Sequence, residues 1–127
     1  MYIDAPNMVS GMAALSIEIL FAAAVKLFLI EEQAITLSFT SGGIRIRFPT
    51  TRRLAEYLEV PHYYILPYFA MMEEQELVTR AERVGILTTA AGSERILTIM
   101  KNEYPEESGA LLGKEIFSAL CRNQETR

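Results

Sequence analysis

The stretch LAEYLEVPHYYILPYFAMMEEQELV, residues 54–78, holds two helical patterns on either side of a proline. A short first helix, begun by a threonine cap at Thr50 or Thr51, has three apolar side chains on one face: Leu54, Ala55 and Leu58. The residue before a proline avoids the helical region of backbone conformation, so Val60-Pro61 predicts a turn. A second helix is expected to begin near His62, which gives two helices packed across a tight turn.

At 100° per residue, the second helix divides into two faces of different chemistry. The inward face carries four large side chains: Ile65, Tyr68, Phe69 and Met72. The outward face carries Tyr63, Pro67, Ala70 and Glu74, and it is flanked by Tyr64, Leu66 and Met71. The stretch from His62 to Val78 contains no lysine and no arginine. The outward face therefore offers hydroxyls, apolar surface and a carboxylate, but no positive charge.

Pro67 lies inside this second helix and can be accommodated in two ways. In a helix that begins near His62, the proline removes the hydrogen bond to the Tyr63 carbonyl, at a cost of about 3 kcal/mol, and a kink is expected. Alternatively, the helix begins at Pro67, because proline is tolerated in the first turn of a helix. Both alternatives are open on the sequence.

Two segments switch from helical spacing to a period of two. Residues 34–48, AITLSFTSGGIRIRF, alternate apolar side chains with hydroxyls and arginines around a Ser-Gly-Gly turn, which predicts a β-hairpin. One side of this hairpin is expected to face the core: Ile35, Leu37, Phe39, Ile44, Ile46 and Phe48. A second pair of short strands is expected in TRAERVGILTTA (79–90), with Gly85 as a turn or bulge residue.

The segment 1–32 is assigned to an N-terminal helix that Asn7 can cap and that ends near Glu32. Its apolar part is long enough to cross a bilayer. However, Glu18 and Lys26 would each cost about 2.5–3.5 kcal/mol near the centre of a membrane span. We therefore expect a helix buried in protein, with no membrane association. Because no positively charged segment precedes it, a secretory signal is not expected either, and the predicted location is cytoplasmic.

Two more helices are expected after the second strand pair. The segment SERILTIMKNEY (93–104) places Ile96, Leu97 and Met100 on one face. Residues 105–122 are assigned to one C-terminal helix with an apolar stripe: Leu112, Ile116, Phe117 and Leu120. No repeat or internal linker interrupts the chain, so residues 1–127 are predicted to form one domain. Its class is mainly α with a small β component (α+β).

Composition excludes several classes of function. The 127 residues carry a net charge of −4, so any nucleic-acid site must come from clustered basic residues and not from the total charge. One cysteine, Cys121, excludes an internal disulfide and a multi-cysteine zinc or iron–sulfur site within one chain, and the only histidine is His62. No nucleophile–base pair, glycine-rich phosphate loop or metal-ligand spacing is present, so we expect no enzymatic activity, no metal and no cofactor.

Four short motifs follow one another between residues 51 and 97: LAEYLEV (54–60), PHYYI (61–65), MMEEQELV (71–78) and LTTAAG (87–92). Their order resembles that of winged helix-turn-helix transcription regulators, in particular the Rrf2 and MarR families. LTTAAG is similar to the strand-to-helix junction of MarR proteins, whereas PHYY and the ELVTRAER run look more like Rrf2. The resemblance implies a helix-turn-helix with its wing over residues 50–97, with the 34–48 hairpin and the terminal helices as additions.

The chain departs from the pattern of these families in three respects. Rrf2 members that sense iron–sulfur chemistry have three cysteines beyond the wing, and this chain has none there, so cluster binding is not implied. Glu76 stands where a glycine usually separates the second helix from the wing. A hairpin occupies the place of a short strand or loop. The last two departures concern how the wing is placed.

The resemblance implies that the helix from His62 lies in the major groove of double-stranded DNA. Base edges are commonly bound by arginine on guanine or by asparagine and glutamine on adenine, and the outward face of this helix has none of these. The positive charge lies on either side of it. The candidate DNA-binding residues are therefore two tyrosines and six arginines: Tyr63, Tyr64, Arg45, Arg47, Arg52, Arg53, Arg80 and Arg83. Arginines that hold phosphates position a protein on DNA without conveying sequence.

Two functional hypotheses follow. The first is a homodimeric transcription regulator, in which the two terminal helices form the interface through Leu15, Leu20, Leu27, Leu112, Ile116 and Leu120. The second is a protein-interaction module without DNA binding, whose patch would consist of Tyr63, Tyr64, Leu66 and Met71. For each arginine, the alternative to a phosphate contact is a solvated surface residue paired with a neighbouring glutamate, as Arg53 with Glu56 and Arg83 with Glu82.

Overall fold

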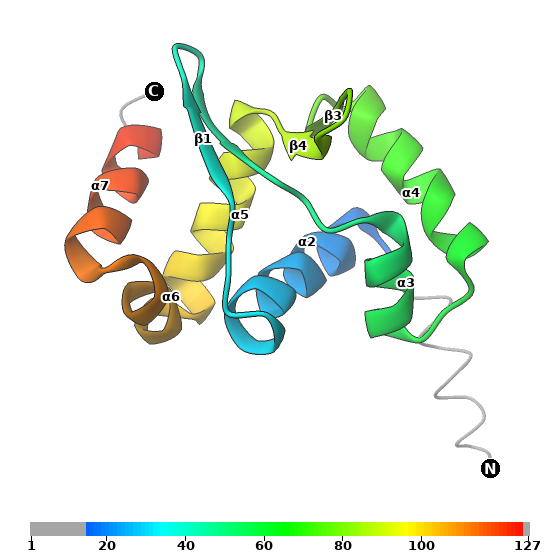
Figure 1. The fold of residues 1–127 in the computed structure, drawn as a ribbon, viewed down its shortest axis with the longest axis horizontal. Coiled ribbons are helices and arrows are strands. Elements are labelled where there is room, and N and C mark those ends of the chain that lie inside the picture. Colours follow the sequence, from blue (N-terminus) through cyan, green and yellow to red (C-terminus); the bar gives the residue numbers. More distant parts are fainter. Residues whose placement is uncertain (1–14, 126–127) are drawn as a thin grey trace.

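The computed structural model describes residues 15–125, in which helices alternate with two β-hairpins (Figure 1). The first half contains α2 (Ile17–Lys26), its π-helical continuation η1 (Leu27–Glu31), β1 (Leu37–Thr40), β2 (Gly43–Ile46), α3 (Thr51–Leu58) and α4 (His62–Glu74). The second half contains β3 (Val78–Ala81), β4 (Gly85–Thr88), α5 (Ala90–Glu103), α6 (Pro105–Leu112) and α7 (Lys114–Glu125). The predicted α+β class is confirmed, since the described chain is mainly helical with two small antiparallel hairpins.

Helix α2 starts later than its apolar sequence suggests. Ser16 has extended backbone, and its hydroxyl accepts a hydrogen bond from the Ile19 N–H at 3.1 Å, which fixes the helix start at Ile17. The prediction of one continuous helix from Asn7 to Glu32 is therefore wrong, although its end is right; Asn7 itself lies outside the described residues. Within residues 15–125, no helix has both the length and the apolar character needed to cross a membrane.

The buried side of α2 forms the centre of the core. Leu20, Phe21 and Leu27 are fully buried, and α2 packs against α3, α4 and α5. The ring of Phe21 lies edge-on to that of Phe48, and Phe48 in turn lies edge-on to Phe69 of α4, with centroid distances of 5.1 and 5.7 Å. This aromatic row joins the N-terminal helix to the segment after the first hairpin and to α4.

The first hairpin forms where its alternation predicts it. Leu37 lies opposite Ile46 and Phe39 opposite Ile44, with Ser41 and Gly42 in the turn. Ile44, Ile46 and Phe48 are buried, and Ile35 and Leu37 are half-buried. Phe39, however, is 70% exposed, so the prediction that it faces the core is wrong. The reason is geometric: among the strands of residues 15–125, β1 pairs only with β2, and the tip of the hairpin projects beyond the helices (Figure 1).

Helix α3 and helix α4 follow the predicted boundaries. Thr50 caps α3 by accepting a hydrogen bond from the Arg53 N–H at 3.0 Å, and Glu59 ends the helix with a left-handed backbone at φ 58°. Helix α4 runs without a break from His62 through Pro67, so the alternative of a start at Pro67 is wrong. Its inward face is as predicted: Ile65, Phe69 and Met72 are buried and Tyr68 is half-buried.

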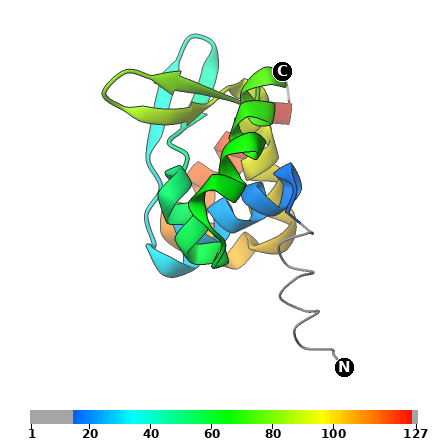
Figure 2. The same cartoon turned by 90° about the vertical axis from the view of Figure 1, so that its right-hand side faces the viewer.

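The two hairpins are connected through β2 and β4. Arg47 forms an antiparallel bridge with Leu87, and the Phe48 N–H donates a hydrogen bond of 2.8 Å to the Ile86 carbonyl. Two buried hydroxyls extend this connection, because the Ile46 N–H donates to Thr88 and the Ser93 hydroxyl donates to the Ile44 carbonyl. Figure 2 shows both hairpins at the same end of the molecule, above α3, where α4 also ends.

The C-terminal region consists of two helices. Gly113 adopts φ 92°, which interrupts the helix between α6 and α7, so the prediction of one helix over residues 105–122 is wrong. Phe117 and Leu120 of α7 are buried against the core, whereas Ile116 is 57% exposed and Leu112 is half-buried.

Burial also corrects the predicted dimer interface. Leu15, Leu20, Leu27 and Leu120 have at most 8% of their surface exposed within a single chain. Side chains that already belong to the core of one chain cannot contact a second copy, so these four are wrong as interface residues. These four leucines pack inside the domain, in the core around the central helix α2.

Candidate nucleic-acid interface

The outward face of α4 is apolar and uncharged over most of its length. Tyr63 is 67% exposed, Leu66 43% and Met71 39%, and Pro67, Ala70 and Glu74 are also exposed. Tyr64 is half-buried against the core, and its ring lies edge-on to that of Tyr63 at a centroid distance of 4.8 Å. Of the two candidate tyrosines, only Tyr63 is therefore positioned as an outward contact. Tyr64 packs against the core and against the ring of Tyr63.

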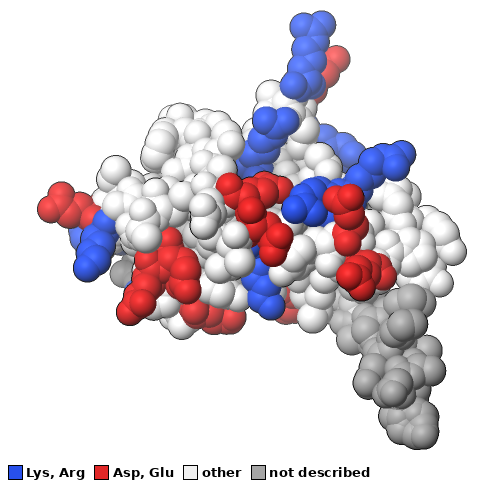
Figure 3. All heavy atoms as spheres, turned by 60° about the horizontal axis from the view of Figure 1, so that its bottom comes forward, with Lys and Arg blue, Asp and Glu red and all other residues white. Residues whose placement is uncertain are grey.

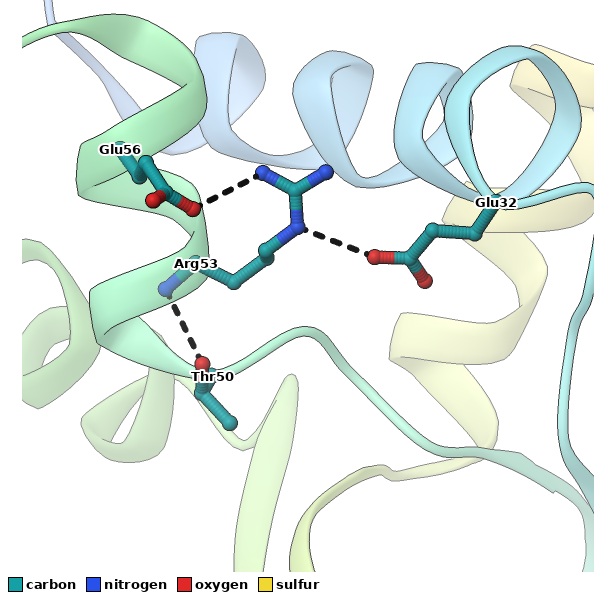
Figure 4. Close-up of polar contacts among 4 residues, drawn as sticks. All are labelled: Glu32, Thr50, Arg53 and Glu56. Carbon is teal, nitrogen blue, oxygen red and sulfur yellow. Dashed lines mark hydrogen bonds and ion pairs between the residues drawn. The ribbon is translucent and has the colours of Figure 1, made fainter.

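Arg53 is held in place by two carboxylates. Its Nε lies 3.1 Å from Glu32 Oε2, and one terminal guanidinium nitrogen lies 3.3 Å from Glu56 Oε1 (Figure 4). The predicted pairing with Glu56 is thus found, together with a second partner 21 residues away in the chain. Because α3 carries Arg53 and Glu32 follows η1, this pair connects α3 to the end of the α2–η1 helix. With two carboxylates beside it, Arg53 contributes little net positive charge to the surface.

Arg80 is also paired. Its Nε lies 3.1 Å from Glu73 Oε2, so the first strand of the second hairpin is connected to the last turn of α4. The pair is partly solvent-exposed, and exposed ion pairs contribute only about 0–1 kcal/mol to stability. Its consequence for binding is electrostatic: a phosphate near Arg80 also meets the carboxylate of Glu73.

Four of the six candidate arginines have no ion pair among residues 15–125. These residues, named here the arginine group, are Arg45 on β2, Arg47 after it, Arg52 on α3 and Arg83 in the turn between β3 and β4. Arg47, Arg52 and Arg83 are exposed and Arg45 is half-buried. The expected pair of Arg83 with Glu82 is not among the ion pairs of the described chain.

Two members of the arginine group lie beside the second hairpin. Arg47 bridges to Leu87, and its Nε lies 3.9 Å from the position that a Cβ would take at Gly85, so its side chain lies along the second hairpin. Arg83 occupies the turn of that same hairpin with φ 68°. Two of the four arginines are thus adjacent to one projecting hairpin.

The surface around these side chains has mixed charge. Figure 3 shows basic side chains on the projection at the top of the view and over its upper right, with acidic side chains directly among and below them. An open cleft of about 370 Å³ between the end of η1, the end of β2 and the start of α3 repeats this pattern, since its walls include Arg47 and Arg53 but also Glu32. On this face and in this cleft, basic side chains are therefore interspersed with carboxylates.

Within residues 15–125, no group of three or more histidine, cysteine, aspartate or glutamate side chains is arranged to hold a metal ion. No protein-family model matches the chain, and no curated protein matches it. The inference of function consequently depends on the residues of this chain and their arrangement.

Proposed function

We propose that the chain is a winged helix-turn-helix domain that binds double-stranded DNA as a dimer, mainly through phosphate contacts, and regulates transcription in the cytoplasm. The element order supports the fold assignment: α3 and α4 form the two-helix unit, and β3 and β4 follow it as the wing. The bridge between Arg47 and Leu87 also supports it, because the strand before the two helices then pairs with the second strand of the wing, as expected for a winged helix.

The observation that carries the DNA-binding proposal is the arginine group. A guanidinium has a planar fork of donors that matches two phosphate oxygens, and it remains charged at all physiological pH values. Arg47 and Arg83 flank the wing, and neither forms an ion pair with a carboxylate of residues 15–125 that a phosphate would have to displace. The outward face of α4 would then contribute Tyr63 and apolar contacts, so that sequence preference would come mainly from DNA shape.

The salt dependence of DNA binding tests this proposal. Four phosphate contacts predict a log–log slope of about −3.6 per bound chain (four times about −0.9), or about a 150-fold loss of affinity between ~50 and ~200 mM salt. Arg47→Ala should reduce the slope to about −2.7 and weaken binding to all duplexes alike. The measurement is fluorescence anisotropy with a labelled random-sequence duplex.

The matched control is Arg122→Ala, which removes an exposed arginine from α7, far along the chain from the arginine group. It should leave the slope unchanged. Absence of binding at ~50 mM salt, or equal effects of the Arg47 and Arg122 variants, would contradict the proposal.

A second candidate function, a protein-interaction module, is favoured by the exposed apolar face of α4. Tyr63, Leu66 and Met71 form three exposed large side chains on one helix that carries no basic residue from His62 to Glu74. Aromatic residues and methionine are enriched in protein interfaces, and lysine is depleted there. A helical face of this composition can pack into an apolar groove of a partner protein.

This second function predicts that the double variant Tyr63→Ser, Leu66→Ser loses a protein partner while keeping its fold. Both side chains are exposed, so the free energy of unfolding should change by less than about 1 kcal/mol. Affinity purification with the full chain, wild type against variant, measures the loss. Tyr64 is left intact because it packs against the core. An identical set of partners for both proteins would count against this function.

A further inference from the structure

The two edges of the first hairpin have different partners. The outer edge of β2 is satisfied by other parts of the chain: the Ile46 N–H donates to Thr88 Oγ1 at 2.8 Å, and the Ile44 carbonyl accepts from Ser93 Oγ at 2.5 Å. The outer edge of β1 pairs with no other strand of residues 15–125. An unpaired edge of this kind is a template for a strand from another chain.

The register of the hairpin defines which backbone groups point outward from β1. The Arg47 N–H donates to the Thr36 carbonyl at 3.0 Å, and these residues are opposite each other when the register of β1 and β2 is continued by one position. Hydrogen-bonded pairs alternate along an antiparallel ladder, so Ser38 and Thr40 also point their backbone groups toward β2. The N–H and C=O groups of Leu37 and Phe39 therefore point away from β2, toward the open edge.

This edge lacks the features that usually protect an exposed strand. Residues 34–41, AITLSFTS, contain no proline and no charged side chain. Natural edge strands are commonly protected by charges, especially lysine, or by proline. In addition, Phe39 is 70% exposed although it lies in a strand whose neighbour β2 is buried. The edge is therefore open to another strand both by its backbone groups and by its side chains.

We propose that two copies of the chain associate through β1, which pairs antiparallel with the partner's β1 around a two-fold axis at Ser38. In this register, Leu37 lies opposite the partner's Phe39, and Phe39 lies opposite the partner's Leu37. These are the positions with outward N–H and C=O groups, so each of the two pairs exchanges both of its hydrogen bonds. The result is a four-stranded sheet in the order β2, β1, the partner's β1 and the partner's β2.

The occupant is a second copy because the edge is complementary to itself. The two-fold axis places Leu37 opposite the partner's Phe39 and Phe39 opposite the partner's Leu37. Both residues have outward backbone groups, so each pair joins two hydrogen-bonding positions and packs an aromatic against an aliphatic side chain. No charge lies in the segment, so two copies meet without like-charge repulsion. The edge is short and the interface is at the small end of the range for specific contacts, so the dimer should form only at protein concentrations of roughly micromolar or above.

The pairing depends on the hairpin alone and not on the proposed DNA binding, but the two are compatible. Arg45 lies opposite Ser38, and Arg47 lies two residues further along the same strand, so both belong to the sheet face opposite to Leu37 and Phe39. In the four-stranded sheet, two copies therefore present their Arg45 and Arg47 side chains on one continuous face.

A cysteine at the two-fold axis tests the register directly. Ser38 would lie opposite the partner's Ser38 as a non-hydrogen-bonded pair, with Cα atoms about 4.5 Å apart, which is within the range of a disulfide. Ser38→Cys, in a Cys121→Ser background, should therefore form a covalent dimer when incubated with oxidised glutathione. Ser41→Cys in the turn is the matched control, because its two copies would lie about 20 Å apart in this register (six residues at about 3.4 Å each).

Charge at the edge tests the interface without a cross-link. Phe39→Lys should shift the association constant at least about tenfold toward monomer in sedimentation equilibrium, and circular dichroism should remain unchanged. Ile116→Lys, which places the same charge on the exposed part of α7, should leave the dimer intact. The proposal is overturned by a wild-type protein that stays monomeric at 1 mM, by equal cross-linking of the two cysteine variants, or by a monomer produced by Ile116→Lys and not by Phe39→Lys.

Discussion

Replacing Gly92 with alanine is expected to lower the free energy of unfolding by about 3 kcal/mol and the melting temperature by roughly 10–15 °C. Gly92 lies in the first turn of α5, where a Cβ would collide with the backbone carbonyl oxygen of Leu77 and would lie 3.0 Å from the Cβ of Thr88. The carbonyl cannot simply withdraw, because it accepts a hydrogen bond from the Thr89 N–H at 3.0 Å. The clash therefore has to separate α5 from the start of β3.

The sign of this effect is informative because helix propensity acts in the opposite direction. Alanine is favoured over glycine inside a helix by about 1 kcal/mol, so a purely local argument predicts that the substitution stabilises α5. Gly109→Ala in α6 is the matched control, since its new Cβ would lie 3.3 Å from the flexible Lys114 side chain, which can move. Thermal unfolding followed by circular dichroism should show a large loss for Gly92→Ala and a change within about 1 kcal/mol for Gly109→Ala. Similar losses for both variants would show that the Leu77 contact is not the cause.

Local patterns predicted the elements whose determinants lie within a few residues of one another. The hairpin at 34–48 was predictable because its period of two and its Ser-Gly turn specify both strands and their register. The inward face of α4 was predictable for the same reason, since Ile65, Phe69 and Met72 recur at helical spacing. Pro67 did not interrupt this helix, and it lies on the exposed side of α4.

Features decided by distant parts of the chain were not predictable in this way. An apolar run cannot reveal that Ser16 takes extended backbone and starts α2 only at Ile17. The exposure of Phe39 depends on where the helices end and not on the strand pattern. The burial of Leu20 and Leu27, two of the predicted interface residues, was not predictable, because a central helix surrounded by other helices has almost no outward side.

The candidate site likewise combines features that the local sequence predicts with features that depend on distant residues. The sequence identified the arginines, but their charge depends on carboxylates brought together by the fold, as Glu32 is to Arg53 across 21 residues. For Arg80, the partner Glu73 comes from the last turn of the neighbouring helix. Of the six candidate arginines, Arg53 and Arg80 are thus paired with carboxylates, and the other four lie on or after β2, in the turn between β3 and β4 and at the start of α3.

Removing either hydroxyl between β2 and α5 is the second large effect that we expect. Thr88 and Ser93 are fully buried, their oxygens are 2.6 Å apart, and each also binds the backbone of β2. Because the Ile46 N–H donates to Thr88 and Ser93 donates to the Ile44 carbonyl, the remaining proton must run from Thr88 to Ser93. Each donor in this chain has one acceptor, so no polar group within it is left unsatisfied.

Thr88→Val keeps the shape of the side chain but leaves the Ile46 N–H buried without an acceptor, which should lower the free energy of unfolding by about 2–3 kcal/mol. Ser93→Ala should cost about 2 kcal/mol, since it leaves the Ile44 carbonyl without a donor. The double variant should cost about 1 kcal/mol less than the sum, because the bond between the two hydroxyls is counted in both single variants. Urea unfolding of the three variants measures this cycle, with Thr79→Val, a half-buried threonine of β3, as the control.

The Thr88→Val variant should also accelerate hydrogen exchange locally in β2, which a general loss of stability would not do. In Thr88→Val, the Ile46 amide loses its acceptor, so its hydrogen exchange should accelerate more than that of amides in the core of α2, whose protection follows global unfolding. Because Arg45 and Arg47 flank Ile46, a loosened β2 would also leave the arginine group less well fixed, and DNA affinity should fall with an unchanged salt slope. If the Ile46 amide exchanges no faster than those of α2, the hydroxyl pair contributes only to global stability and does not fix the strand that carries the arginines.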